Sequence, residues 1–375
     1  MTFSTKINVP KINCGRFFED FIFNEVIQHA TPRTITAGDC ALYIALTGSR
    51  NPLHCSEPFA QSLGYTNKNN PSMPVDDLLV FHIAFGKTVP DISVNAVANL
   101  GYADVRFLQP VFVGDTLSTS SQVIGLKQNS NNKSGVVWVR STAINQRGEP
   151  VLNWVRWVMV HKDTSHLGDL KRTPPMTVVP TLPSFVAPDN LNVPACFSAK
   201  KLDTTMTGGQ YFWEDYQAGE RINHVAGMTI NPADHTLATR LYQNNARLHF
   251  DDNLMKDSSF GQRLVYGGVI ISLCRALSFE GLENALTILA INAGTHANPS
   301  FAGDTIYCAT EVLEAWELPN RKDIGALRLR MIGIKNRSPS EMSSEITDFK
   351  TDGKYHENVV LDLDYTVLMP RKEAT

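Results

Sequence analysis

The feature that most constrains this sequence is an internal repeat. At an offset of 195 residues, matched positions include Phe18-Glu-Asp-Phe21 with Trp213-Glu-Asp-Tyr216, His29 with His224, Asp39 with Asp234 and His54 with His249. Further along, the offset is 189, and Gly114-Asp-Thr116 falls on Gly303-Asp-Thr305. Loops tolerate such a change in length. A period this long indicates two copies of a whole domain rather than a solenoid.

Composition limits the class of protein. The 375 residues suffice for two domains of ordinary size, each with its own core. The formal net charge is −3 and no Lys/Arg-rich run occurs, so neither nucleic acid nor an anionic membrane surface is an expected partner. The six cysteines form no C-x-x-C pair and predict reduced thiols. Without a signal peptide or a bilayer-spanning apolar run, a cytoplasmic globular protein is expected.

A proline-rich stretch separates the two copies. Six of the 20 prolines lie between residues 163 and 205, namely Pro174, Pro175, Pro180, Pro183, Pro188 and Pro194. This composition predicts an extended linker. The expected organisation is an N-terminal domain of residues 1–165, a linker of residues 166–205 and a C-terminal domain of residues 206–375.

Both copies show the same order of expected elements. The first copy has a short strand at 34–36, helices at 39–46 and 57–63 with a polar loop at 49–54 between them, a buried central helix at 75–85, and strands near 104–108, 117–124, 135–144 and 151–160. The second copy has a central helix at 267–278 and strands at 287–292, 305–314, 325–335 and 359–367. A helix followed by antiparallel strands is an α+β pattern in which a sheet wraps the helix.

Two motifs resemble those of the MaoC-like dehydratases. Ser49-Arg-Asn-Pro-Leu-His54 is similar to the Asp-x-Asn-Pro-x-His loop that precedes the central helix in that group. Pro110-Val-Phe-Val-Gly-Asp-Thr116 is similar to its Pro-Val-x-x-Gly-Asp-Thr turn, and Pro299-Ser-Phe-Ala-Gly-Asp-Thr305 departs from it only at Ser300. The resemblance, together with the duplication, implies a double hotdog, in which each of two tandem domains has a central helix wrapped by an antiparallel sheet.

Longer segments resemble one family within that group, the mesaconyl-CoA hydratases. These segments are 81–102, 125–130, 145–149 and 155–160, and the likeness extends from about residue 17 to residue 370. It implies a hydro-lyase that reversibly hydrates mesaconyl-CoA (2-methylfumaryl-CoA) to β-methylmalyl-CoA, with CoA as part of the substrate and no metal or redox cofactor. The chain also lacks the glycine-rich loops typical of nucleotide cofactor sites.

The resemblance implies roles for the loop and for the start of the central helix. In this group the loop Asp and His hold and deprotonate water, and backbone N–H groups at the helix start receive the thioester oxygen. Here the Asp position is Ser49 in one copy and Asn244 in the other. Asn244 can orient water but cannot take its proton. The base is therefore His249, or a carboxylate from elsewhere, such as one of Asp39, Asp76, Asp77 and Asp234.

The second copy is the expected active one. Its central helix starts at Tyr266-Gly-Gly268, where glycine permits close backbone approach, whereas Val75-Asp-Asp77 in the first copy would repel an oxyanion. The predicted catalytic residues are His249 and Asn244, with Gly267 and Gly268 as oxyanion donors. The first copy is expected to shape the acyl-CoA tunnel as a degenerate partner.

The substrate's second carboxylate requires a cation, because a buried unpaired carboxylate is costly. Arg247 and Arg50 are the loop candidates, with a solvated arginine as the alternative. Tyr266 and His54 complete the predicted substrate-binding residues, although His54 fits a structural loop histidine equally well. For His296 a core position is favoured over one facing the site. The lysines or arginines that hold the CoA phosphates are not singled out.

Two other functions fit the same fold. An acyl-CoA thioesterase would use a carboxylate at a central helix, for which Asp76 or Asp77 is available. A non-catalytic acyl-CoA-binding protein would explain the loss of both loop Asp residues. Fold alone does not separate these functions. In every case we expect an acyl-CoA ligand and a homo-oligomer, most simply a dimer.

Overall fold

The computed structural model describes residues 11–66, 73–163, 176–342 and 349–372. In the first half its elements are η1 (Phe18–Asp20), β1 (Val26–Gln28), β2 (Arg33–Thr34), α1 (Ala37–Thr47), α2 (Pro52–Cys55), α3 (Glu57–Ser62), α4 (Asp77–Ile92), β3 (Ala96–Phe107), β4 (Thr116–Gln128), β5 (Ser134–Ile144) and β6 (Pro150–His161). The predicted linker up to residue 175 lies outside the described residues. Its remainder carries η2 (Pro188–Asn190) and η3 (Ala199–Lys201), and α5 (Thr204–Thr207) crosses the predicted end of the linker at residue 205.

The second half repeats this order. Its elements are η4 (Trp213–Asp215), β7 (Arg221–Asn223), β8 (Met228–Thr229), α6 (Pro232–Leu241), η5 (Arg247–His249), α7 (Asp252–Met255), α8 (Gly267–Leu277), β9 (Thr287–Thr295), β10 (Thr305–Leu318), β11 (Arg321–Lys335), α9 (Pro339–Met342), β12 (Lys350–Thr351), β13 (Lys354–Tyr355) and β14 (Val359–Pro370). The predicted central helices and strand runs are confirmed.

Equivalent residues make equivalent contacts in the two halves. His29 Nε2 lies 2.7 Å from Ser121 Oγ, and His224 Nε2 lies 2.9 Å from Thr310 Oγ1. Each contact ties the segment before the first helix to the long strand behind it. The sequence repeat is therefore a repeat of structure.

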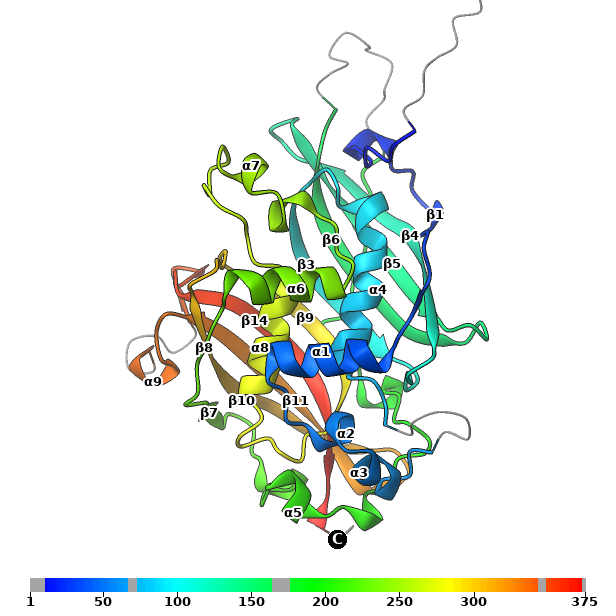
Figure 1. The fold of residues 1–375 in the computed structure, drawn as a ribbon, viewed down its shortest axis with the longest axis vertical. Coiled ribbons are helices and arrows are strands. Elements are labelled where there is room, and N and C mark those ends of the chain that lie inside the picture. The colour runs from blue at the N-terminus through cyan, green and yellow to red at the C-terminus, as the bar shows by residue number, and fades with distance from the viewer. Residues whose placement is uncertain (1–10, 67–72, 164–175, 343–348, 373–375) are drawn as a thin grey trace, which may run out of the picture.

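One antiparallel sheet runs through both halves. Its order is β1-β4-β5-β6-β3-β9-β14-β11-β10-β7, so β3 and β9 form the seam between the halves. At this seam Tyr102 lies opposite Gly294, and Val105 lies opposite Ile291. The two central helices, α4 and α8, lie on the same side of the sheet, and α1 and α6 cross in front of them (Figure 1). The main hydrophobic core spans both halves and includes Phe81 of α4 and Ile271 of α8.

Local sequence explains the helix ends and two departures from the predicted boundaries. Thr36 and Asp39 cap α1 reciprocally, and Gly48, with φ of 69°, ends it. The predicted loop at 49–54 contains the short helix α2, because Asn51 caps it and Pro52 occupies its first turn. Helix α4 continues past the predicted end at Phe85 to Ile92, since Val89 and Ile92 are buried as well.

In the described parts of the chain, no helix has the length and apolarity needed to cross a membrane. All six cysteines are free thiols, in agreement with the sequence expectation.

Candidate active site

A cavity of about 510 Å³ lies between the two halves of the chain. The first half contributes residues of α4, β3 and β6, including Phe85, Tyr102 and Arg156. The second half contributes residues 244–270 and 296–300, including the predicted Asn244, His249, Tyr266 and Gly267. A volume of this size suits a small-molecule ligand. The structure thus brings four of the predicted site residues together.

His249 is held as a neutral imidazole at the cavity wall. It is buried, and its Nδ1 lies 2.9 Å from the carbonyl oxygen of Leu264. Because a carbonyl only accepts, Nδ1 carries the proton and Nε2 carries the lone pair. Burial, opposed by this hydrogen bond, lowers the pKa of His249 to about 4. The free nitrogen can therefore act as a base at neutral pH.

Asn244 presents a donor to the cavity. Its Oδ1 accepts a hydrogen bond of 3.0 Å from the backbone N–H of Ala246. This contact identifies the oxygen, so the NH₂ group remains for a ligand. Asn244 can thus hold the oxygen of a water molecule, but it cannot remove a proton from it.

The N-terminus of α8 offers unpaired backbone donors. Tyr266 is the N-cap residue and its side chain makes no capping hydrogen bond. Among the described residues, no acceptor meets the N–H groups of Gly267 or Gly268. A Cβ on Gly267 would lie 2.3 Å from Cε1 of His296, and one on Gly268 would lie 2.3 Å from Cε1 of Tyr266. Only glycine fits this helix start, where the helix dipole favours negative charge.

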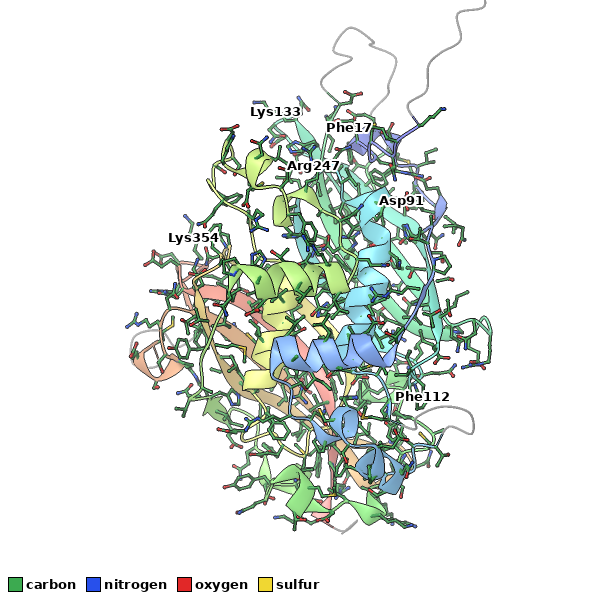
Figure 2. The ribbon with its side chains drawn as sticks, viewed as in Figure 1. Phe17, Asp91, Phe112, Lys133, Arg247 and Lys354 are labelled. Atoms are coloured by element: carbon green, nitrogen blue, oxygen red, sulfur yellow. The ribbon has the colours of Figure 1, made fainter. Side chains whose placement is uncertain are left out.

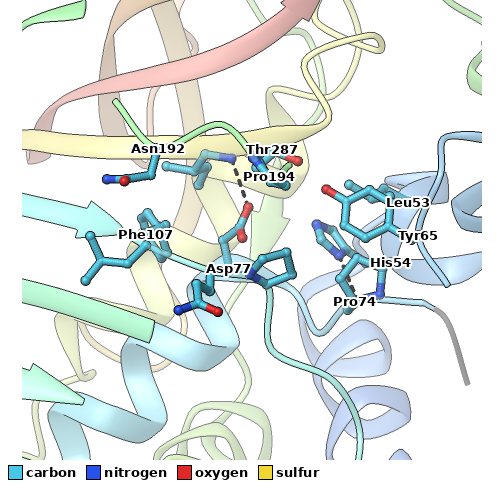
Figure 3. A pocket seen from close by; sticks show the side chains of 13 residues that line it. Leu53, His54, Tyr65, Pro74, Asp77, Phe107, Asn192, Pro194 and Thr287 are labelled. Carbon is cyan, nitrogen blue, oxygen red and sulfur yellow. Dashed lines mark hydrogen bonds between the residues drawn. The ribbon is translucent and has the colours of Figure 1, made fainter. Parts of the chain in front are cut away.

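The matching place in the first half is closed. His54 Nδ1 lies 3.1 Å from the carbonyl oxygen of Pro74, as His249 does from Leu264. The Asp77 carboxylate stands where Gly267 stands in the second half and accepts a 2.9 Å hydrogen bond from the Ile288 N–H (Figure 3). Asp76 caps α4 through the N–H of Leu78. The two spaces beside His54 hold only about 20 Å³ each, so His54 lies away from the large cavity.

The two loop arginines also lie away from the cavity. The side chain of Arg247, labelled in Figure 2, is 62% exposed. It pairs with Asp251 at 3.3 Å. Arg50 pairs with Glu280 at 3.1 Å and packs over the Phe279 ring. Both guanidinium groups are satisfied at the surface and neither lines the large cavity, which favours the alternative of a solvated arginine at each position.

Comparison with known proteins shows which family the chain belongs to. The mesaconyl-CoA hydratase family model matches residues 2–347. The chain belongs to the mesaconyl-CoA hydratase family. It is 54% identical to the β-methylmalyl-CoA dehydratase of Chloroflexus aurantiacus over 96% of this chain and 99% of that protein. It is 51% identical to the mesaconyl-CoA hydratase of Cereibacter sphaeroides, over 96% and 100%.

Solved structures establish the fold. A MaoC-domain protein from Chloroflexus aurantiacus superposes with a TM-score of 0.91 at 54% identity, covering 97% of this chain and all of that one. A Mycobacterium tuberculosis protein described as a double hotdog superposes with a TM-score of 0.73 at 25% identity, covering 95% and 99%. The predicted α+β double hotdog is confirmed, and this member of the hydratase family places its large cavity at the seam.

Three aromatic or imidazole groups complete the cavity beside the helix start. His296 Nε2 lies 3.1 Å from the Tyr102 hydroxyl, and burial lowers the pKa of His296 to about 4. The Tyr266 hydroxyl is buried without a partner among the described residues, and its ring centroid lies 5.5 Å from that of His249. The sequence favoured a core position for His296. The structure instead places this half-buried residue on the cavity wall, with its ring against Gly267.

Arg156 is a cavity residue that the sequence interpretation did not select. It lies on β6 with its side chain fully buried, and it lines the cavity. A usable signal was present, since Trp154, Arg156 and Val158 alternate along a strand and must share one face. The charge therefore stands on the face that carries the large apolar side chains.

An open groove of about 720 Å³ adjoins the cavity, and Asn244 lines both. The groove carries the cationic side chains of Lys87 and Arg240. The Lys87 ammonium donates to Gln243 Oε1, and burial lowers the pKa of Lys87 to about 8. Neither cation has a carboxylate partner within the described ranges, so both remain available to a ligand.

Proposed function

We propose that this chain is a hydro-lyase that reversibly adds water to mesaconyl-CoA to form β-methylmalyl-CoA. The observation that carries the proposal is the convergence of three groups on one cavity in a member of the hydratase family. These groups are the neutral His249, the amide of Asn244 and the uncapped start of α8. Together they supply a base, a water ligand and an oxyanion site.

The reaction follows from the placement of these groups. The NH₂ group of Asn244 holds a water oxygen while Nε2 of His249 takes one of its protons. The oxygen then bonds to C3 of the acyl group, and the electron pair of the double bond moves to the thioester oxygen. The N–H groups of Gly267 and Gly268 donate to this enolate oxygen. The His249 imidazolium returns its proton to C2, which restores the neutral base.

The groove beside Asn244 suits the CoA part of the substrate. A thioester at the start of α8 leaves the pantetheine arm free to pass Asn244 toward Lys87 and Arg240. These two cations would then meet the phosphates of the nucleotide. We also expect two chains to associate and the protein to be cytoplasmic, and both remain predictions.

The thioesterase alternative has less support from the first half. Asp76 is engaged as the cap of α4, and Asp77 is bonded to the Ile288 N–H beside a space of about 20 Å³. Neither carboxylate faces a cavity that could admit a thioester. Catalysis by hydrolysis would need a different carboxylate, and none lines the large cavity among its described residues.

The proposal is tested by incubating the purified chain with mesaconyl-CoA. We expect the enoyl-thioester absorbance to fall without release of free thiol, because water adds to the double bond and leaves the thioester intact. Thiol release would identify a thioesterase. No change in either signal over a panel of enoyl-CoA esters, with tight binding, would identify a binding protein.

A further inference from the structure

The wall of the cavity contains a buried cation without a counter-ion. Arg156 is fully buried, its Nη1 donates to Ser93 Oγ at 2.9 Å, and its Nη2 donates to Thr88 Oγ1 at 2.8 Å. Its Nε has no hydrogen-bond partner among the residues that the structure describes. Removing a charge from water is costly unless an opposite charge compensates it. Within the described parts of the chain, no carboxylate lies within ion-pair distance of this guanidinium.

Other arginines on strands of the same sheet are paired with carboxylates, as expected of structural ion pairs. Arg328 binds Asp364 and Glu314, and Arg330 binds Asp362 at 2.8 Å. Arg156 instead contacts two neutral hydroxyls and lies 4.3 Å above the centroid of the Phe85 ring. Burial lowers its pKa to about 10, so it still carries a full charge at neutral pH. Its environment therefore lacks one anion.

We propose that Arg156 binds the free carboxylate of the mesaconyl group and so selects dicarboxylic acyl thioesters. This assignment rests on the proposed function. In mesaconyl-CoA the free carboxylate is attached to C3, the carbon that receives the hydroxyl group. An ion pair at Arg156 would therefore hold C3 in a fixed position relative to the catalytic base.

The cavity wall connects Arg156 to the catalytic groups. Arg156 lies directly opposite Tyr102 in the β3–β6 pair, so the two side chains share one face. The Tyr102 hydroxyl reaches His296, whose ring packs against Gly267 at the start of α8. A short dicarboxylic acyl group can thus place its thioester at α8 and its carboxylate toward β6.

The test compares two substrates that differ only in this carboxylate. Mesaconyl-CoA is set against (E)-2-methylbut-2-enoyl-CoA, in which a methyl group replaces it. We expect Arg156→Gln to lower kcat/KM for mesaconyl-CoA by about 10²- to 10³-fold, as when a buried charge pair loses one member. The kcat/KM of this variant for the methyl substrate should fall only slightly or rise. An equal loss for both substrates would overturn the assignment, whereas failure of the unmodified chain to hydrate mesaconyl-CoA would overturn the proposed function.

Two controls separate recognition from folding. Arg140→Gln removes a guanidinium from the neighbouring strand β5, where Arg140 pairs with Asp104 outside the cavity, and should leave the substrate ratio unchanged. If Arg156→Gln does not fold, the unmodified chain still decides the matter. It should bind the saturated methylsuccinyl thioester of CoA at least tenfold more tightly than 2-methylbutanoyl-CoA, about the effect of one charged hydrogen bond. Equal affinities would refute the role of Arg156.

Discussion

His249 and His54 occupy equivalent places in the two halves, each with Nδ1 bound to the carbonyl oxygen that closes the segment before a central helix. The distances are 2.9 Å to Leu264 and 3.1 Å to Pro74. Only His249 faces the large cavity, because the helix next to it begins with glycine while the helix next to His54 begins with a carboxylate. One arrangement of the chain thus yields a cavity-lining imidazole in one half and a packed side chain in the other.

This pair of histidines gives a matched test of the base. His249→Gln should lower kcat for hydration by about 10²- to 10⁴-fold, since it removes the proton acceptor. His54→Gln makes the same chemical change at the equivalent site and should lower the thermal midpoint while kcat stays near normal. Steady-state rates and melting curves of both variants decide the question. Equal rates for the two variants would mean that the base lies elsewhere.

The pH dependence of catalysis should reflect the burial of His249. Its pKa of about 4 keeps the imidazole neutral throughout the range in which an ordinary histidine, near 6.5, takes up a proton. We expect kcat/KM to be level through pH 6.5 and to fall only toward pH 4. Because the unfolded chain binds this proton more readily, stability from this group is present above pH 6.5 and is lost between pH 6.5 and 4.

A second variant shows which histidine causes the fall in kcat/KM at low pH, here called the acid limb of the pH profile. His296→Gln removes the other cavity imidazole, and the limb should persist at the same pH if His249 is responsible. A limb centred near pH 6.5 in the unmodified chain would contradict the buried, neutral base.

Asn244→Asp tests whether an amide is required at the water site. One carboxylate oxygen can still accept from the Ala246 N–H, and the other can bind and deprotonate the water. We expect activity to be kept or raised, measured as kcat with mesaconyl-CoA. Asn244→Leu, which keeps the bulk but has no polar group, should lower kcat strongly. Complete loss in Asn244→Asp would show that the amide donor is indispensable.

Lys87 and Arg240 can be tested with a truncated substrate. Changing both to Gln should raise KM for mesaconyl-CoA by about tenfold or more, because two charged hydrogen bonds to phosphate are removed. The N-acetylcysteamine thioester of the same acid lacks the phosphates, so its kcat/KM should not change. An equal effect on both thioesters would place the CoA phosphates elsewhere.

Asp77 provides a stability test in the closed half. Burial raises its pKa from 3.8 to about 6, so the folded chain binds this proton more tightly than the unfolded chain does. The amount by which this carboxylate lowers the free energy of unfolding therefore grows as the pH rises from 3.8 to 6, and it reaches its full size above pH 6. Asp77→Asn should be more stable at pH 7.5 by up to about 3 kcal/mol, and the gain should shrink toward pH 4.

The contrasting variant is Asp104→Asn, which breaks the ion pairs of Asp104 with Arg106 and Arg140. It should destabilise the chain at pH 7.5, whereas Asp77→Asn stabilises it. Denaturant unfolding at the two pH values measures both effects. No gain from Asp77→Asn at pH 7.5 would show that its carboxylate is well solvated.

Local patterns predicted most of the fold but only part of the site. Alternating strands such as 151–160 and the central helices depend on neighbouring residues, and the repeat follows from comparing the sequence with itself, so all of them can be found along the sequence. His249, Asn244, Gly267 and Tyr266 carry a recognisable motif and a glycine-marked helix start.

The remaining site residues depend on contacts between distant segments. Arg156 faces the cavity only because β6 pairs with β3 beneath the C-terminal half of α4, and Tyr102 meets His296 across the seam between the halves. Arg247 and Arg50 were chosen for their closeness in sequence to the loop motif. Their direction depends on Asp251 and Glu280, which a linear motif does not reveal.

The β3–β9 seam has a consequence for how the enzyme behaves on dilution. The cavity takes Tyr102 and Arg156 from one half and His249 and Gly267 from the other, and the strand pairing that aligns them lies within a single polypeptide. Two separate hotdog chains would lose such a cavity whenever their concentration fell below the dissociation constant of their pairing. Here the covalent connection keeps the effective concentration of one half around the other fixed, so every chain retains its composite cavity however few chains are present.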